Sequence, residues 1–72
     1  FDKRLAAYLA DEYVKLGSDV ISTTHEQIAK NLGTAREVVS RMLKYFEKEG
    51  LVALGRGTIT IKNVSGLKKL LY

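Results

Sequence analysis

The 72-residue sequence has no cysteine, no proline and no tryptophan, and it has one histidine and one methionine. Without cysteine the chain forms no disulfide, and it binds neither structural zinc nor an iron–sulfur cluster through thiolates. No apolar run approaches the roughly 20 residues that a helix needs to cross a bilayer, and no signal peptide is visible. We therefore expect no membrane partner and no cofactor bound to this chain, and the setting is compatible with the cell interior.

The remaining composition is that of an ordinary globular protein, with 46% hydrophobic and 28% charged residues. A chain of this length forms one small domain with a thin hydrophobic core. It begins at Phe1 and not at methionine. We therefore expect residues 1–72 to be a single domain excised from a longer protein.

Charge is unevenly distributed along the chain. Residues 1–33 carry four Lys or Arg against five Asp or Glu, whereas residues 34–72 carry eight against three. A basic segment of this kind is typical of nucleic-acid-binding proteins, although a modest surplus of lysine is also common on other surfaces.

The pattern of residues 34–50 predicts one amphipathic helix. We expect the other segments of the chain to pack around this helix. Thr34 and Glu37 have the spacing of a capping box at its start, and Gly50 is a stop signal at its end. At 100° per residue, the predicted core side carries Ala35, Val39, Met42, Leu43 and Phe46. On or near the opposite side lie Glu37, Ser40, Arg41, Lys44 and Lys48.

A second short helix is predicted immediately before it, over residues 24–32, with Thr24 and Gln27 as another capping box. Only Gly33 separates this helix from Thr34, so the two helices must cross steeply. Ala29 is small enough for the close approach that such a crossing requires. The pattern is that of a helix-turn-helix whose second helix is the recognition helix.

The flanking segments complete a fold. A first helix is predicted over Phe1–Leu16, with Gly17 as its stop, and Val20-Ile21 predict a short strand. The apolar stripe of the first helix is predicted to comprise Phe1, Leu5, Leu9 and Leu16, with Tyr8 and Tyr13 at its margins and Val14 pointing away.

After Gly50 the hydrophobic period changes from 3.6 to 2. Residues 51–54 and 58–61 predict the strands of a hairpin, in which Gly55 and Gly57 supply positive φ angles. Ser65 is expected to cap a last short helix with Leu67, Leu70 and Leu71 on its apolar side, and with Lys68 and Lys69 in solvent. The predicted fold is mainly α with a small β-hairpin wing, a winged helix-turn-helix of the α+β class.

The sequence resembles the C-terminal DNA-binding domain of the cyclic-AMP receptor and fumarate-nitrate regulator (Crp/Fnr) family of bacterial transcription factors. The resemblance is carried by T-x-E-x-I-A-x-x-L-G-T-x-R-E-x-V-S-R-x-L at residues 24–43, E-x-E-G-L at residues 47–51 and G-R-G-x-I-x-I at residues 55–61. It implies a cytoplasmic homodimer with an N-terminal sensor domain, a palindromic operator in double-stranded DNA, and RNA polymerase as a further partner.

The family reads bases with the motif that lies here on Arg36, Glu37, Ser40 and Arg41. Arginine donates to guanine O6 and N7, and glutamate accepts from cytosine N4, so Arg41 and Glu37 suit G·C pairs in the major groove. The remaining site residues are expected to contact phosphates, which position the protein without reading sequence; they are Thr24, Thr34, Lys44 and Arg56, the last in the wing at residues 51–61.

Two other function classes compete with this prediction. An enzyme is disfavoured because the lone His25, expected to be exposed in a first helical turn, has no converging partners, and because Gly55-Arg56-Gly57 lacks the context of a phosphate-binding loop. A winged helix that binds protein or RNA is the more serious alternative, since the fold does not fix function. The basic and acidic side chains at residues 36, 37 and 41 argue against it.

Overall fold

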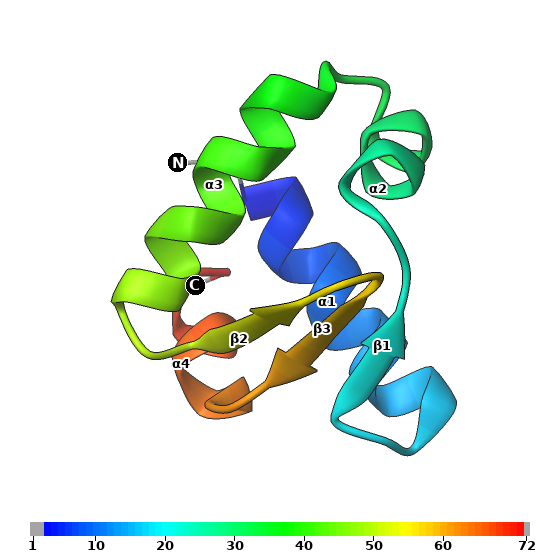
Figure 1. Cartoon of the computed structure of the whole chain (residues 1–72). Coiled ribbons are helices and arrows are strands. Elements are labelled where there is room, and N and C mark those ends of the chain that lie inside the picture. Colours follow the sequence, from blue (N-terminus) through cyan, green and yellow to red (C-terminus); the bar gives the residue numbers. More distant parts are fainter. Residues whose placement is uncertain (1–2, 72) are drawn as a thin grey trace.

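The computed structural model describes residues 3–71, and its elements follow one another in the predicted order (Figure 1). The elements are α1 (Lys3–Leu16), β1 (Val20–Ser22), α2 (His25–Leu32), α3 (Arg36–Lys48), β2 (Val52–Gly55), β3 (Thr58–Ile61) and α4 (Val64–Lys69). Phe1, which the sequence places at the start of the first helix, lies outside the described residues.

The three strands form one antiparallel sheet in the order β1-β3-β2. Ile59 of the central strand pairs with Ile21 on one side and with Leu54 on the other. The predicted strand at Val20-Ile21 is therefore real, and it supports a hairpin that would be marginal as two strands.

The hairpin turn differs in detail from the prediction. Gly55 already belongs to β2 and pairs with Thr58, so the connecting loop is Arg56-Gly57. Of the two glycines only Gly57 has a positive φ, of 69°. The expectation for Gly55 is wrong because strand pairing continues through it.

The hydrophobic core joins all the helices to the sheet. In Figure 1, α2 lies at the upper right, α3 runs down the left side to β2, α1 passes between them and behind the sheet, and α4 lies below the sheet. The largest fully buried side chains are Phe46, Leu5, Leu9, Ile28, Leu43, Ile59, Leu67, Val39 and Val52. This packing fixes the orientation of α3, because three of these residues lie on its inner face.

The stripe predicted for α1 is correct in the middle and wrong at the end. Leu5 and Leu9 are buried, Tyr13 packs against the core, and Val14 points to solvent as predicted. Leu16 is 52% exposed, because the chain leaves the helix at Gly17, which has a φ of 62°.

Two further helix ends were predicted, one correctly. Gly50 ends α3 with a φ of 76°, and its N–H donates to the Glu47 carbonyl at 3.0 Å. Ser65 does not cap α4. The cap is Asn63, whose Oδ1 accepts from the Gly66 N–H at 3.0 Å.

Lys68 and Lys69 of α4 are exposed, as predicted, and Leu67 is buried. Across residues 3–71, no helix combines the length and the apolar character needed to span a membrane.

Candidate nucleic-acid interface

The turn between α2 and α3 is held by backbone hydrogen bonds. Gly33 adopts a left-handed conformation with a φ of 68°, which costs a residue with a side chain about 1–2 kcal/mol. Its N–H donates to the Lys30 carbonyl at 3.4 Å, and the Thr34 N–H donates to the Ala29 carbonyl at 3.0 Å. This pair of bonds is a Schellman motif, which closes α2 and leads directly into α3.

The expected capping box at Thr34 is therefore wrong. The backbone of Thr34 still belongs to the turn that ends α2, and the N-cap of α3 is Ala35. Ala35 is exposed and not part of the core face, and it has no side-chain acceptor for the first helical N–H groups. The recognition helix thus begins at Arg36 and ends at Lys48, inside the predicted range 34–50.

The N-cap predicted at Thr24 is confirmed, and the start of α2 connects to the wing. Thr24 Oγ1 accepts from the Gln27 N–H at 3.1 Å, as an N-cap does. One residue earlier, the Thr23 N–H donates to the Gly57 carbonyl at 3.1 Å. This bond holds the turn of the wing beside the beginning of the helix-turn-helix.

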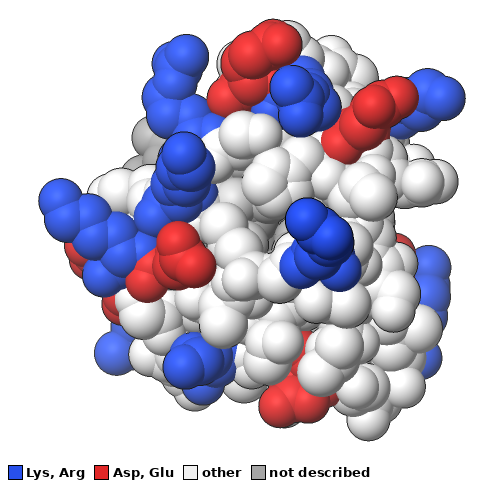
Figure 2. Space-filling view, in the orientation of Figure 1, with Lys and Arg blue, Asp and Glu red and all other residues white. Residues whose placement is uncertain are grey.

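One face of α3 gathers the predicted base-reading residues. Arg36, Glu37, Ser40, Arg41 and Lys44 together line a shallow hollow of about 320 Å³. All of them are exposed except Ser40, which is partly buried. Figure 2 shows basic side chains with a few acidic ones between them along the edge formed by α3.

A second hollow, of about 280 Å³, lies between the start of α2 and the turn of the wing. Its lining includes Thr24, His25, Arg36, Gly55 and Gly57. Arg36 borders both hollows, so the predicted phosphate contact Thr24 and the base-reading face adjoin. Thr34 lines neither of the two.

Sequence reasoning missed a contact inside this surface. His25 was expected to be solvent-exposed, but it is partly buried, and its Nδ1 lies 2.8 Å from Ser40 Oγ. The two residues are 15 positions apart. The available signal was that Ser40 falls between the apolar and polar arcs of its helix, where a neighbouring helix can reach it.

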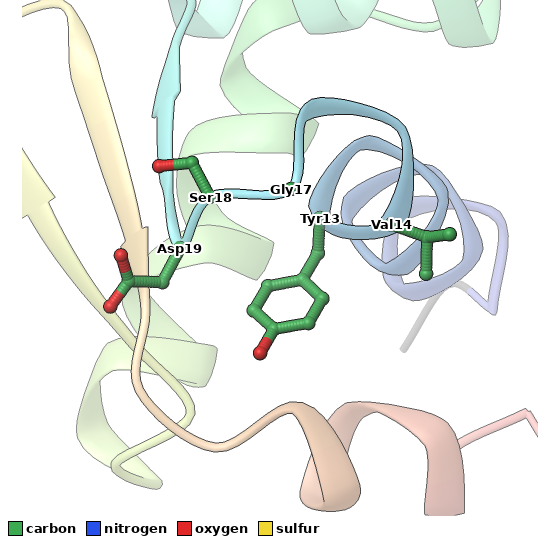
Figure 3. A pocket seen from close by; sticks show the side chains of 5 residues that line it. All are labelled: Tyr13, Val14, Gly17, Ser18 and Asp19. Atoms are coloured by element: carbon green, nitrogen blue, oxygen red, sulfur yellow. The ribbon is translucent and has the colours of Figure 1, made fainter.

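A third hollow lies away from α3, at the end of α1 (Figure 3). It is lined by Tyr13, Val14, Gly17, Ser18 and Asp19. In Figure 3, Tyr13 and Val14 point to different sides of the helix, and the Asp19 carboxylate is turned away from the Tyr13 ring. Within the described part of the chain, no group of three or more His, Cys, Asp or Glu side chains is placed to hold a metal ion.

Comparison with known proteins places this arrangement in a family. The Crp-like helix-turn-helix domain matches residues 3–70. The chain belongs to that family. The transcriptional regulator SdrP of Thermus thermophilus is 33% identical over 54 residues, which are 75% of this chain and 27% of SdrP. The transcriptional regulatory protein btr of Bordetella pertussis is 32% identical over 77 aligned positions, covering 97% of this chain and 32% of btr.

Solved structures confirm the fold of this Crp-like domain. A chain assigned to the Crp/Fnr family from Eubacterium rectale has a TM-score of 0.94 and 48% identity, covering 99% of this chain and 33% of that chain. The Thermus thermophilus Catabolite Activator Protein has a TM-score of 0.80 and 30% identity, covering 96% of this chain and 33% of that chain. The Crp-like domain thus spans about a third of each of these structures.

Proposed function

We propose that the chain binds double-stranded DNA sequence-specifically as the DNA-binding domain of a bacterial transcription regulator. The observation that supports this most directly is the exposed set on one face of α3, where two arginines, a glutamate and a lysine line a single hollow. In a helix-turn-helix, this face of the second helix enters the major groove. Both curated relatives named above are called transcriptional regulators, in agreement with the proposal.

Base reading is assigned to the first turns of α3. Arg41 donates to guanine O6 and N7 through its guanidinium fork, and Glu37 accepts from cytosine N4. Arg36, at the first position of the helix, contacts an outer base or a phosphate. Ser40 lies between them at the edge of the face and contributes a hydroxyl group.

Phosphate contacts are assigned to the rim of the same surface. Lys44 lies one turn beyond Ser40 and Arg41 on the exposed side of α3, and Arg56 lies in the two-residue loop of the wing. Thr24 and Thr34 lie at the two ends of α2. Contacts at these points hold the domain on the duplex from both sides of the groove without reading sequence.

The arrangement in the whole protein is also part of the proposal. The chain spans 27% and 32% of the two curated relatives. In line with the resemblance to the Crp/Fnr family, we propose that a sensor domain with its own effector site and a dimerisation segment accompany it in the whole protein. A symmetric dimer reads two half-sites about 34 Å apart, which explains a palindromic operator. RNA polymerase is then the partner through which bound protein alters transcription in the cytoplasm.

The proposal is tested by selecting duplexes from a random library and measuring affinity for the selected and for scrambled DNA at several salt concentrations. Arg41→Ala should cost about 1–3 kcal/mol on selected DNA and relax selectivity at one base pair. Lys44→Ala and Arg56→Ala should weaken binding to both duplexes alike and lower the salt slope by about one unit.

Lys15→Ala is the matched control, because it removes the same charge from the exposed end of α1. It should change neither selectivity nor, beyond a small general effect, affinity. Failure of the wild type to enrich any duplex contradicts DNA reading, and preferential binding of RNA under the same conditions would favour the alternative RNA-binding function.

A further inference from the structure

The hydrogen bond between His25 and Ser40 joins the two helices at the edge of the proposed reading face. His25 is the first residue of α2, and Ser40 lies in the second turn of α3. The Nδ1 to Oγ distance is 2.8 Å, and the contact is partly buried. Ser40 also lines the hollow that contains Arg36, Glu37 and Arg41, so the residue that contacts His25 also borders the face that we propose reads DNA.

The chemistry of the pair determines what the hydroxyl offers to DNA. A serine hydroxyl has one proton to donate and two lone pairs to accept with. If His25 Nδ1 carries a hydrogen, Ser40 accepts it and keeps its own proton for an acceptor such as thymine O4. If Nδ1 is bare, Ser40 donates to it and offers only a lone pair, which suits a donor such as the adenine or cytosine amino group.

An unrestrained serine does not discriminate in this way. Serine makes contacts with any of the bases, because its hydroxyl rotates to suit its partner. A hydroxyl that donates to its neighbour keeps only lone pairs for a base, and one that accepts from its neighbour keeps its proton and one lone pair, so in both cases its choice of base partner is narrower. Serine by itself is not selective among the bases. The contact with His25 supplies a reason for Ser40 to be selective.

We propose that His25 is a positioning residue for base recognition, which holds the Ser40 hydroxyl in one orientation and so sets the base preference at the position that Ser40 faces. This inference rests on the proposed DNA-binding function. The simpler alternative is that His25 contacts a phosphate, since it borders the second hollow between α2 and the wing. The two roles differ in outcome, because a phosphate contact changes affinity for all sequences and a positioning role changes one base preference.

The test measures base frequencies at each position of duplexes selected from a random library, for the wild type and four variants. The hydroxyl is removed by Ser40→Ala, the imidazole by His25→Ala, and both groups in the double variant. His25→Asn is the conservative variant, because an asparagine amide offers a nitrogen or an oxygen close to the place of Nδ1. Thermal unfolding of each variant shows that it is folded.

We expect His25→Ala and Ser40→Ala to flatten the preference at the same base position, each with a two- to tenfold loss of affinity for the best wild-type duplex, about the worth of one hydrogen bond. The double variant should show no further loss, and His25→Asn should restore the preference. Glu26→Ala, which changes the exposed neighbour of His25 on α2, should leave all base frequencies as they are.

The inference is overturned if His25→Ala leaves the frequencies unchanged, flattens a different position from Ser40→Ala, or weakens binding to every duplex equally. A wild type that selects no sequence refutes the proposed function instead. The two failures are therefore distinguishable in one experiment, because the wild-type library is read before any variant.

Discussion

The start of α3 has no capping side chain. It therefore gives an experiment for which the structure and the sequence pattern predict different results. Ala35 occupies the N-cap with φ and ψ of −82° and 147°, the extended conformation that N-caps adopt. It is exposed and makes no side-chain hydrogen bond. A serine at this exposed position would bring an Oγ that can accept from an N–H in the first turn of α3.

We expect Ala35→Ser to stabilise the protein by about 1 kcal/mol, because Ser-to-Ala changes at N-caps typically cost that amount. In a domain of 60–100 residues this raises the melting temperature by about 4–8 °C. Far-UV circular dichroism during heating, together with urea unfolding, measures the change. The stabilisation should appear in the absence of DNA, because it arises from the helix itself.

Thr34→Ala is the paired control. Thr34 contributes to the turn through its backbone N–H, which donates to Ala29, and alanine keeps that group. The substitution should therefore change stability by less than about 0.5 kcal/mol. The reverse result, in which Thr34→Ala costs about 1 kcal/mol and Ala35→Ser has no effect, would refute the observed start of α3 and restore the capping box predicted from the sequence.

Three further changes test the backbone of the domain by equilibrium unfolding. Gly33→Ala should destabilise by about 1–2 kcal/mol through its left-handed φ alone, since an added Cβ meets no atom within 4 Å. Alanine usually favours a helix over glycine by about 1 kcal/mol. Gly66→Ala should nevertheless destabilise the protein, because the added Cβ would lie 2.5 Å from Leu51 Cδ2. A stabilising result would contradict that packing. Thr24→Ala should cost about 1 kcal/mol by removing the cap on the Gln27 N–H, and no loss would contradict the cap.

The order of elements was predictable because each element has a local signal. Period 3.6 gives way to period 2 at Gly50, and the glycines at positions 17, 33 and 50 all have positive φ and end helices. A glycine with no side chain is nearly the only residue that takes this conformation without strain. These signals depend on a few neighbouring residues, so they are readable without tertiary structure.

The starts of α3 and α4 were not predictable, because in each region a residue with a good capping side chain does not form the cap. Thr34 has a good N-cap side chain, but the Schellman motif of α2 uses its backbone first. Ser65 and Asn63 are both good capping residues, but the backbone at Asn63 is held by a segment distant in the sequence: the N–H groups of Lys62 and Asn63 both donate to the Leu51 carbonyl, at 2.9 and 3.1 Å. A long-range contact of this kind leaves no pattern in the local sequence.

The candidate site was also predictable only in part from the sequence. Helical periodicity places Glu37, Arg41 and Lys44 on one face, and the structure confirms that they lie together. Which base or phosphate each one contacts stays a prediction. The bond from His25 to Ser40 depends on the crossing of α2 and α3, and periodicity within a single helix says nothing of that crossing.

Glu37 provides the sharpest test of base reading, because its charge opposes binding. A carboxylate in the groove is repelled by the phosphates, so removing the charge should tighten non-specific binding unless Glu37 accepts a hydrogen bond from a base. The structure simplifies the experiment, since Thr34 is not the N-cap and the side chain of Glu37 has no capping-box partner there. What remains is its favourable position in the first turn, worth about 0.3–1 kcal/mol through the helix dipole.

We therefore expect Glu37→Gln to lower affinity for the selected duplex and to raise affinity for a scrambled one, measured by fluorescence anisotropy at several salt concentrations. Glu47→Gln removes the same charge from an exposed position later in α3, and it should strengthen binding to both duplexes slightly. If Glu37→Gln behaves as Glu47→Gln does, with an equal gain on both duplexes, Glu37 does not read a base. The carboxylate would then act only through its charge, and base reading by α3 would have to come from the arginines and Ser40.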